Sequence, residues 1–94
     1  MRFREKVALI TAAGSGIGRA TAEIIGSEGG AVVGVDTEQA RLDAVVDGVR
    51  RGGGQAEGRR ADALDPAQVT EVVDGVARTH GRIDILVNAV GGSA

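Results

Sequence analysis

The sequence predicts an α/β domain with a doubly wound parallel sheet, and two kinds of pattern support this. Short, continuous apolar runs such as residues 7–10 and 31–35 are typical of parallel strands that are covered on both faces. Between the runs, apolar residues recur at steps of three and four, which predicts helices with one buried face. Strands and helices therefore alternate along the chain, as they do in layered α/β domains.

The first strand is expected over residues 6–12, and a glycine-rich turn follows it directly. Residues 11–18 have the sequence Thr-Ala-Ala-Gly-Ser-Gly-Ile-Gly. The helix that begins at Ile17 is expected to end at the glycine pair 29–30. Its predicted buried face consists of Ile17, Ala20, Thr21, Ile24 and Ile25.

This turn has the features of a phosphate-binding site. A strand that passes into a helix through glycines leaves free backbone N–H groups at the positive end of the helix dipole. Gly16 is expected to let the backbone approach a pyrophosphate, and Gly18 to let the helix pack tightly on the strand. Asp36 follows the second strand, residues 31–35, about 20 positions beyond the glycines, which is the spacing of a dinucleotide-binding unit.

The second helix is expected to begin after a cap at Thr37 and to end at the glycines of residues 52–54. Its predicted buried face consists of Leu42, Val45, Val46 and Val49. Residues 55–61 are rich in arginine and glycine, and they predict a strand at the edge of the sheet whose polar side chains reach water.

The third helix has the clearest start signal. Asp65 is expected to cap it, with Pro66 at its first position, Gln68 completing a capping-box-like arrangement and Gly81 ending it. Its predicted buried face consists of Val69, Val72, Val73, Val76 and Ala77. Residues 83–87 predict a fourth strand that runs into Asn88.

The connections predict how the strands are ordered in the sheet. Right-handed crossovers place the first two helices on one face if the first three strands step in one direction. The fourth strand then returns beside the first, so the third helix lies on the opposite face and the strand order is 3-2-1-4. Gly16 and Asn88 are expected at the mouth of the crevice between the carboxyl ends of the first and fourth strands.

Composition limits the class of protein. The chain has 94 residues, a net charge of −2 and no cysteine, so one small domain over residues 1–94 is expected, with no thiolate metal site. With this net charge the chain has no positive electrostatic field that would attract nucleic acid. The arginine pairs at residues 50–51 and 59–60 are expected to lie in solvent at the ends of helices and strands. No apolar run approaches the roughly 18 residues that a bilayer span needs, and a cytoplasmic protein is expected.

Together these features resemble the short-chain dehydrogenase/reductase family over nearly the whole chain. The family motif Thr-Gly-x-x-x-Gly-x-Gly aligns with residues 11–18, with Ala12 in place of the first glycine. The resemblance implies the amino-terminal part of a Rossmann-type doubly wound sheet. It also implies hydride transfer between the nicotinamide of NAD and an alcohol or carbonyl substrate.

The resemblance also implies the cofactor contacts. Asp36 would accept hydrogen bonds from the adenosine ribose, Asp62 would bind the adenine amino group, and the N–H of Ala63 would contact the adenine ring. NADP-preferring relatives carry a basic residue where this chain has Ser15 or Thr37, so NAD is the expected cofactor. The implied cofactor-binding residues are Ala12, Gly14, Ser15, Gly16, Ile17, Gly18, Asp36, Asp62, Ala63, Asn88, Ala89 and Gly91.

In this family, a tyrosine, a lysine four residues later and a serine assist the hydride transfer. The chain has no tyrosine, its only lysine is Lys6, and His80 is expected to be a capping or solvated residue rather than a proton relay. We therefore expect an inactive cofactor-binding portion of a longer enzyme, in which only the longer form binds substrate. The alternative is a non-catalytic nucleotide-binding or regulatory module.

The unpaired edge of the last strand and a partly covered sheet face predict self-association.

Overall fold

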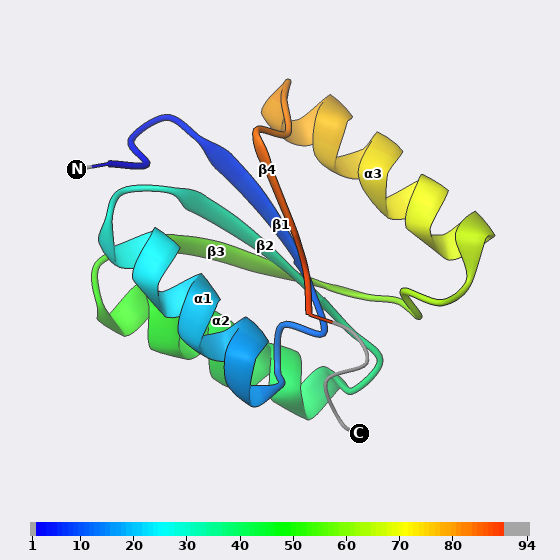
Figure 1. Cartoon of the computed structure of the whole chain (residues 1–94), viewed down its shortest axis with the longest axis horizontal. Coiled ribbons are helices and arrows are strands. Elements are labelled where there is room, and N and C mark those ends of the chain that lie inside the picture. The colour runs from blue at the N-terminus through cyan, green and yellow to red at the C-terminus, as the bar shows by residue number, and fades with distance from the viewer. Residues whose placement is uncertain (1, 90–94) are drawn as a thin grey trace.

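A computed structural model of the chain describes residues 2–89. Strands and helices alternate as the sequence predicts (Figure 1). They are β1 (Val7–Thr11), α1 (Gly16–Ser27), β2 (Ala31–Asp36), α2 (Gln39–Arg51), β3 (Gln55–Arg60), α3 (Pro66–His80) and β4 (Ile85–Asn88). None of the helices within residues 2–89 has the length and apolar character that a membrane crossing needs.

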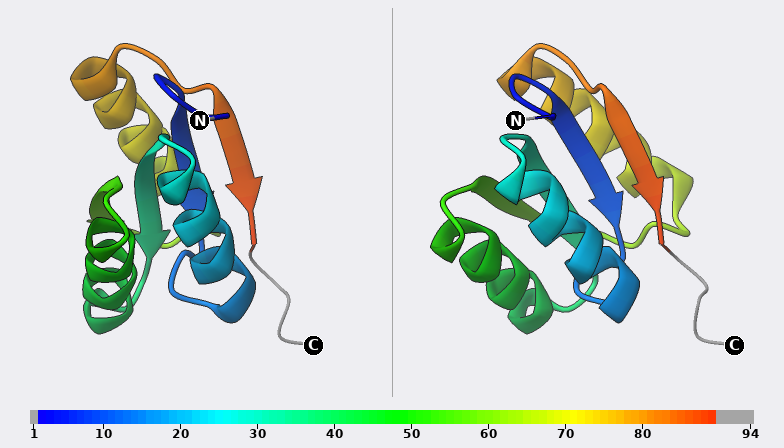
Figure 2. Two further views of the ribbon diagram at one scale, coloured as in Figure 1. Left: turned by 90° about the vertical axis from the view of Figure 1, so that its left-hand side faces the viewer. Right: turned by 60° about the vertical axis from the view of Figure 1, so that its left-hand side comes forward.

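The four strands form one parallel sheet in the order β3-β2-β1-β4. This confirms the predicted order 3-2-1-4. Helices α1 and α2 cover one face of the sheet and α3 covers the other (Figure 2). Strand β1 pairs with both β2 and β4, so the point at which the strand order reverses lies between β1 and β4.

Two apolar layers hold the helices on the sheet. Alternate residues of β1 point to opposite faces: Ala8 and Ile10 lie in the layer under α1 and α2, whereas Val7 and Leu9 lie in the layer under α3. The α1 and α2 layer also contains Ala13, Ala22, Ile25, Val32, Val45 and Val49. The α3 layer also contains Val33, Val35, Ala61 and Val76. Because the two inner strands are covered on both faces, β1 and β2 are continuous apolar runs.

The predicted buried face of α1 is correct at Ile25 but is otherwise shifted by about one residue. Its buried residues are Gly18, Ala22, Ile25 and Gly26, whereas Ile17 is 70% exposed and Ile24 is 55% exposed. Small residues face the sheet and the neighbouring helix, and a Cβ at Gly26 would come within 2.5 Å of Val49 Cγ1. Hydrophobic periodicity alone does not identify a face made of small residues, although the close approach of α1 and α2 requires one.

The predicted cap at Thr37 is also wrong. The N-cap of α2 is Glu38, which makes no side-chain cap hydrogen bond. The backbone N–H of Glu38 instead donates to Asp36 Oδ1 at 3.0 Å, because a short acidic side chain readily accepts from the backbone two residues later.

At α3 the Asp65 cap and Pro66 are as expected, with Ala67 N donating to Asp65 Oδ1 at 3.0 Å. Gln68, however, does not complete a capping box. Its amide donates to Asp65 Oδ2 at 3.0 Å, and its oxygen accepts from Asp62 N at 2.9 Å.

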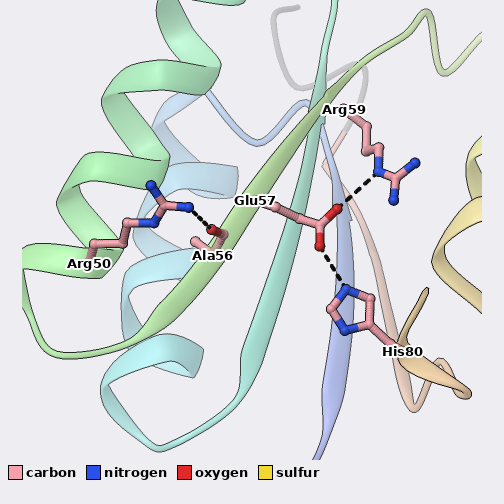
Figure 3. A network of polar contacts seen from close by, with 5 residues as sticks. All are labelled: Arg50, Ala56, Glu57, Arg59 and His80. Carbon is pink, nitrogen blue, oxygen red and sulfur yellow. Dashed lines mark hydrogen bonds and ion pairs between the residues drawn. The ribbon is translucent and has the colours of Figure 1, made fainter.

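His80 is neither a capping residue nor solvated. Its Nε2 lies 2.7 Å from Glu57 Oε1, which joins the last turn of α3 to the edge strand β3, and Arg59 Nε donates to the same carboxylate at 3.0 Å (Figure 3). Burial raises the pKa of Glu57, but the hydrogen bonds from His80 and Arg59 outweigh that effect and hold the pKa below its ordinary value. Figure 3 also shows Arg50 of α2 bound to the Ala56 carbonyl oxygen, so Arg50 and His80 join the edge strand to α2 and α3.

The outer side of β4 is exposed within the described residues. β4 pairs there only with β1, and Leu86, in the middle of the strand, is 66% exposed. Ile85 and Val87 pack partly against the α1 and α2 layer. This agrees with the predicted open edge and incomplete cover of the α3 face.

Candidate functional site

The turn between β1 and α1 is held by Ser15. The Ser15 N–H and hydroxyl both donate to the carbonyl oxygen of Ala12, at 3.0 and 2.7 Å. The same hydroxyl accepts from Gly18 N at 3.3 Å and so caps α1. The chain reverses at Ala12, whose φ of 50° lies in the left-handed region that an L side chain rarely adopts.

The two glycines at the start of α1 differ in their surroundings. A Cβ at Gly18 would overlap the carbonyl oxygen of Ala12, whereas a Cβ at Gly16 would meet nothing within 4 Å. Gly18 is therefore needed for the close packing of helix and turn. Above Gly16 there is open space over the helix terminus. The N–H groups of Gly16 and Ile17 precede the first intrahelical hydrogen bond, which Arg19 N donates to Ser15 O, and N–H groups at this position of a helix can bind an anion.

Asp36 at the end of β2 is directed at this turn. It is 7% exposed, and its Oδ2 accepts from Gly14 N at 3.1 Å while its Oδ1 accepts from Glu38 N at 3.0 Å. Within residues 2–89 no ion pair neutralises it. An ionised carboxylate has about four acceptor positions, so each oxygen can accept one further hydrogen bond from a ligand.

A pocket of about 190 Å³ opens beside Asp36 at the carboxyl ends of β2 and β3. Its far wall is the loop after β3, in which Asp62 Oδ1 accepts from Leu64 N at 2.9 Å and the Leu64 side chain is 77% exposed. The lining residues are Ala12, Ser15, Val35, Asp36, Thr37, Arg41, Ala61, Asp62, Ala63 and Leu64. The structure thus brings together five of the site residues expected from the sequence, which are Ala12, Ser15, Asp36, Asp62 and Ala63.

Asn88 lies on the other side of the turn. It is the Cα partner of Thr11 in the pairing of β1 with β4, and Thr11 Oγ1 donates to Asn88 Oδ1 at 2.9 Å. This places the end of β4 at the predicted crevice, where the strand order reverses. Ala89 follows it directly in the chain, and Gly91 lies outside the described residues.

The lining residues that are not among the expected site residues are Val35, Thr37, Arg41, Ala61 and Leu64. Arg41, on the first turn of α2, and Leu64, in the loop after β3, both line the pocket. For Arg41 a usable signal existed, because the first turn of the helix after an acidic strand end lies over the same crevice as that acid. Nothing in the residue pattern marks Leu64.

A family model described as short chain dehydrogenase matches residues 6–94. The uncharacterised oxidoreductase YxbG of Bacillus subtilis is 40% identical over 90 residues, which cover 96% of this chain and 33% of YxbG. The chain thus spans about a third of the length of that relative. It covers 82% of the shorter short-chain dehydrogenase/reductase homolog YusS of Bacillus subtilis, which is 34% identical over 89 residues, 94% of this chain.

Solved structures agree in fold. A Burkholderia xenovorans protein assigned to the short-chain dehydrogenases/reductases superposes with a TM-score of 0.94 at 40% identity, over 99% of this chain and 37% of that one. An NAD⁺-bound xylitol dehydrogenase gives a TM-score of 0.87 at 36% identity, over 92% and 33%. A metagenomic short-chain oxidoreductase in complex with NADP gives 0.88 at 34% identity, over 92% and 39%. Structural neighbours thus include both an NAD and an NADP complex.

Proposed function

Because the chain belongs to the short-chain dehydrogenase family, we propose that it is the dinucleotide-binding portion of an NAD(H)-dependent oxidoreductase. The reaction proposed is hydride transfer between the nicotinamide and an alcohol or carbonyl carbon, in a longer protein that supplies the substrate site. The family accounts for the oxidoreductase class. The preference for NAD, the substrate class, the role of residues 1–94 as one cofactor-binding unit and a cytoplasmic location are parts of the proposal.

The observation that carries the proposal is the placement of the Asp36 carboxylate. It is buried, it is not neutralised within the described residues, and it is held against Gly14 with one acceptor position left on each oxygen. Two neighbouring hydroxyl groups, as on a ribose, match two such acceptors. A 2′-phosphate in the same place would bring like charges together.

The other site residues fit the remaining parts of a dinucleotide. The N–H groups of Gly16 and Ile17 are at hand for the pyrophosphate, with open space above Gly16. Asp62 and Ala63, on the far wall of the pocket, would hold the adenine. Asn88 would contribute its backbone carbonyl oxygen near the adenosine ribose, and Ala89 and Gly91 are proposed from their positions in the motif alone.

When bound, the nicotinamide supplies the hydride. The residues of this chain bind and orient the cofactor, but they include no tyrosine and a single lysine at position 6, before β1. His80, the one histidine, is occupied by Glu57 on the outer strand. We therefore expect no turnover from the 94-residue chain with NADH and carbonyl substrates, although it binds the cofactor. The second candidate, a nucleotide-binding module without catalysis, is favoured by the same lack of a proton relay.

Calorimetric titration of the folded chain with NAD tests the proposal. Asp36→Asn should weaken NAD binding more than tenfold, because a hydrogen bond to a charged group is worth roughly 1.5–3 kcal/mol. Asp74→Asn, which changes an exposed aspartate of α3, is the matched control and should bind like the parent chain. Failure of the folded parent chain to bind NAD, or equal affinity of the Asp36 variant, would refute the proposal.

A further inference from the structure

We propose that the contact between His80 and Glu57 is a proton-sensitive latch that holds α3 on the sheet. When the imidazole carries a proton, the contact is an ion pair and α3 stays docked. When the imidazole is neutral, α3 leaves the sheet more readily while the rest of the domain stays folded. The latch lies on the face of the sheet opposite α1 and α2, and the inference does not depend on the proposed function.

The first observation is that α3 is packed lightly on the sheet. Within residues 2–89, α3 alone covers its face of the sheet (Figure 2). Of its 15 residues, those that are buried are Gly75 and Val76, and Val72 and Val73 are partly buried against the α3 layer. Beside Val69 and Val72 a cavity of about 20 Å³ remains between the first turns of α3 and the sheet. Little apolar burial therefore opposes the release of α3.

The second observation is a polar cluster of Glu57, Arg59 and His80, which joins the last turn of α3 to β3 (Figure 3). His80 Nε2 lies 2.7 Å from Glu57 Oε1, and Arg59 Nε donates to Glu57 Oε2 at 3.0 Å. The side chains of His80 and Glu57 are 23% and 33% exposed, so solvent screens their contact only in part. A Cβ at Gly75 would lie 2.9 Å from Arg59 Nη1, so the guanidinium rests against α3 as well.

The third observation is the charge of the carboxylate in this cluster. Burial raises the pKa of Glu57, but the hydrogen bonds and charges of His80 and Arg59 lower it further, and the pKa lies below its ordinary value. Glu57 is therefore ionised around neutral pH. The strength of its contact with His80 then depends on whether the imidazole carries a proton.

Other charged groups on the elements around the cluster are paired or exposed. Val33, an uncharged residue, lies opposite Glu57 on β2. The loop after α3 holds Arg82 and Asp84, which pair with each other at 2.7 Å. The other charged residues of α3 are exposed, and they are Glu71, Asp74 and Arg78. The contact between His80 and Glu57 is therefore the one that we expect to respond to a proton on the imidazole.

Histidine suits a latch because its charge changes near neutral pH. A protonated imidazole attracts the Glu57 carboxylate as an ion pair, whereas a neutral imidazole offers it a hydrogen bond alone. In the released state the imidazole has no carboxylate partner. Protonation therefore favours the docked state over the released state, and α3 is held more firmly at pH 6 than at pH 8.

Amide hydrogen exchange of the ¹⁵N-labelled chain tests the latch, followed by NMR at pH 6 and pH 8 and corrected for the intrinsic exchange rate. The reporters are the amides of Val72 and Val76 on α3, and those of Val45 and Val49 on α2 are the reference. At pH 8 the α3 amides should open at least about tenfold more often than the α2 amides, because α3 leaves the sheet separately. At pH 6 they should open about threefold to tenfold less often than at pH 8.

Two variants remove the two halves of the contact. His80→Gln keeps a polar side chain that takes up no proton near neutral pH, so its α3 amides should open equally often at both pH values. Glu57→Gln keeps the histidine but removes the charge that attracts it, so the pH dependence should be lost here too. Asp74→Asn, which changes an exposed carboxylate of the same helix, is the matched control and should keep the pH dependence of the parent chain.

Three results would overturn the inference. They are α3 amides that open equally often at pH 6 and pH 8 in the parent chain, α3 amides that open no more often than those of α2, and a pH dependence that persists in His80→Gln. Circular dichroism confirms that each variant is folded, and if His80→Gln did not fold, the result with Glu57→Gln would decide. No cofactor is present in these experiments, so a failure to bind NAD would refute the proposed function and leave this inference standing.

Discussion

Replacing Ala12 by glycine should stabilise the protein, although the change removes a side chain. Ala12 has a φ of 50°, and a left-handed conformation costs an L residue roughly 1–2 kcal/mol. Glycine avoids this cost, but it loses about 0.4–1 kcal/mol more conformational entropy on folding. The net expectation is a gain of roughly 0.5–1 kcal/mol in the free energy of unfolding, or about 2–8 °C in Tm for a domain of this size.

Urea denaturation followed by circular dichroism measures this change, and Ala13→Gly is the control next to it. Ala13 is fully buried in the α1 and α2 layer and has no positive φ. Its replacement should lower stability by about 1–2 kcal/mol, from one lost methyl group and the added entropy of glycine. If Ala12→Gly destabilised the chain as much as Ala13→Gly, the strained turn would not exist and the reasoning would be refuted.

Further predictions concern the turn, the edge strand and the open side of the sheet. Gly18→Ala should lower the free energy of unfolding by more than about 1 kcal/mol, because its Cβ would overlap the backbone oxygen of Ala12. Gly16→Ala should leave the free energy of unfolding unchanged in denaturation but weaken NAD binding in calorimetry. The lowered pKa of Glu57 means that its contribution to stability is present above the ordinary glutamate pKa and is lost as pH falls through the folded pKa. Glu57→Gln should therefore reduce the loss of stability between pH 7 and pH 3, and an unchanged pH profile would contradict this. Leu86→Lys should reduce self-association in light scattering with little loss of stability, because Leu86 is 66% exposed on the outermost strand; a parent chain that stays monomeric at high concentration would disprove the predicted association.

Much of the fold could be predicted because its sheet is parallel and buried. The apolar runs are continuous, glycines end α1 and α2, and right-handed crossovers leave few ways to order four strands. The face of α1 could not be predicted in the same way. Its buried side uses Gly18, Ala22 and Gly26, and hydrophobicity patterns give such small residues little weight although they decide how closely two elements approach.

The site residues could be predicted where the backbone conformation or the end of a strand requires a particular residue type. The glycines at residues 16 and 18 and the acid at the end of β2 are such marks, and Asp36 indeed points at the turn. The contact made by His80 could not be predicted in this way, whereas Arg41 had one signal, its place on the first turn of the helix after Asp36. The contact of His80 with Glu57 depends on the packing of α3 against β3, and the position of Arg41 depends on how α2 crosses Gly14.

The central claim, that the turn after β1 and the Asp36 carboxylate hold a dinucleotide, is tested most directly by following the backbone amides of the ¹⁵N-labelled chain by NMR during titration with NAD. We predict that the amide signals of Gly14, Gly16, Ile17 and Ala63 shift most and saturate together, because the two N–H groups at the start of α1 would bind the pyrophosphate. Amides on the outer face of α3, such as that of Asp74, should stay in place. Shifts confined to α3, or no shifts in a folded chain at millimolar NAD, would contradict the account.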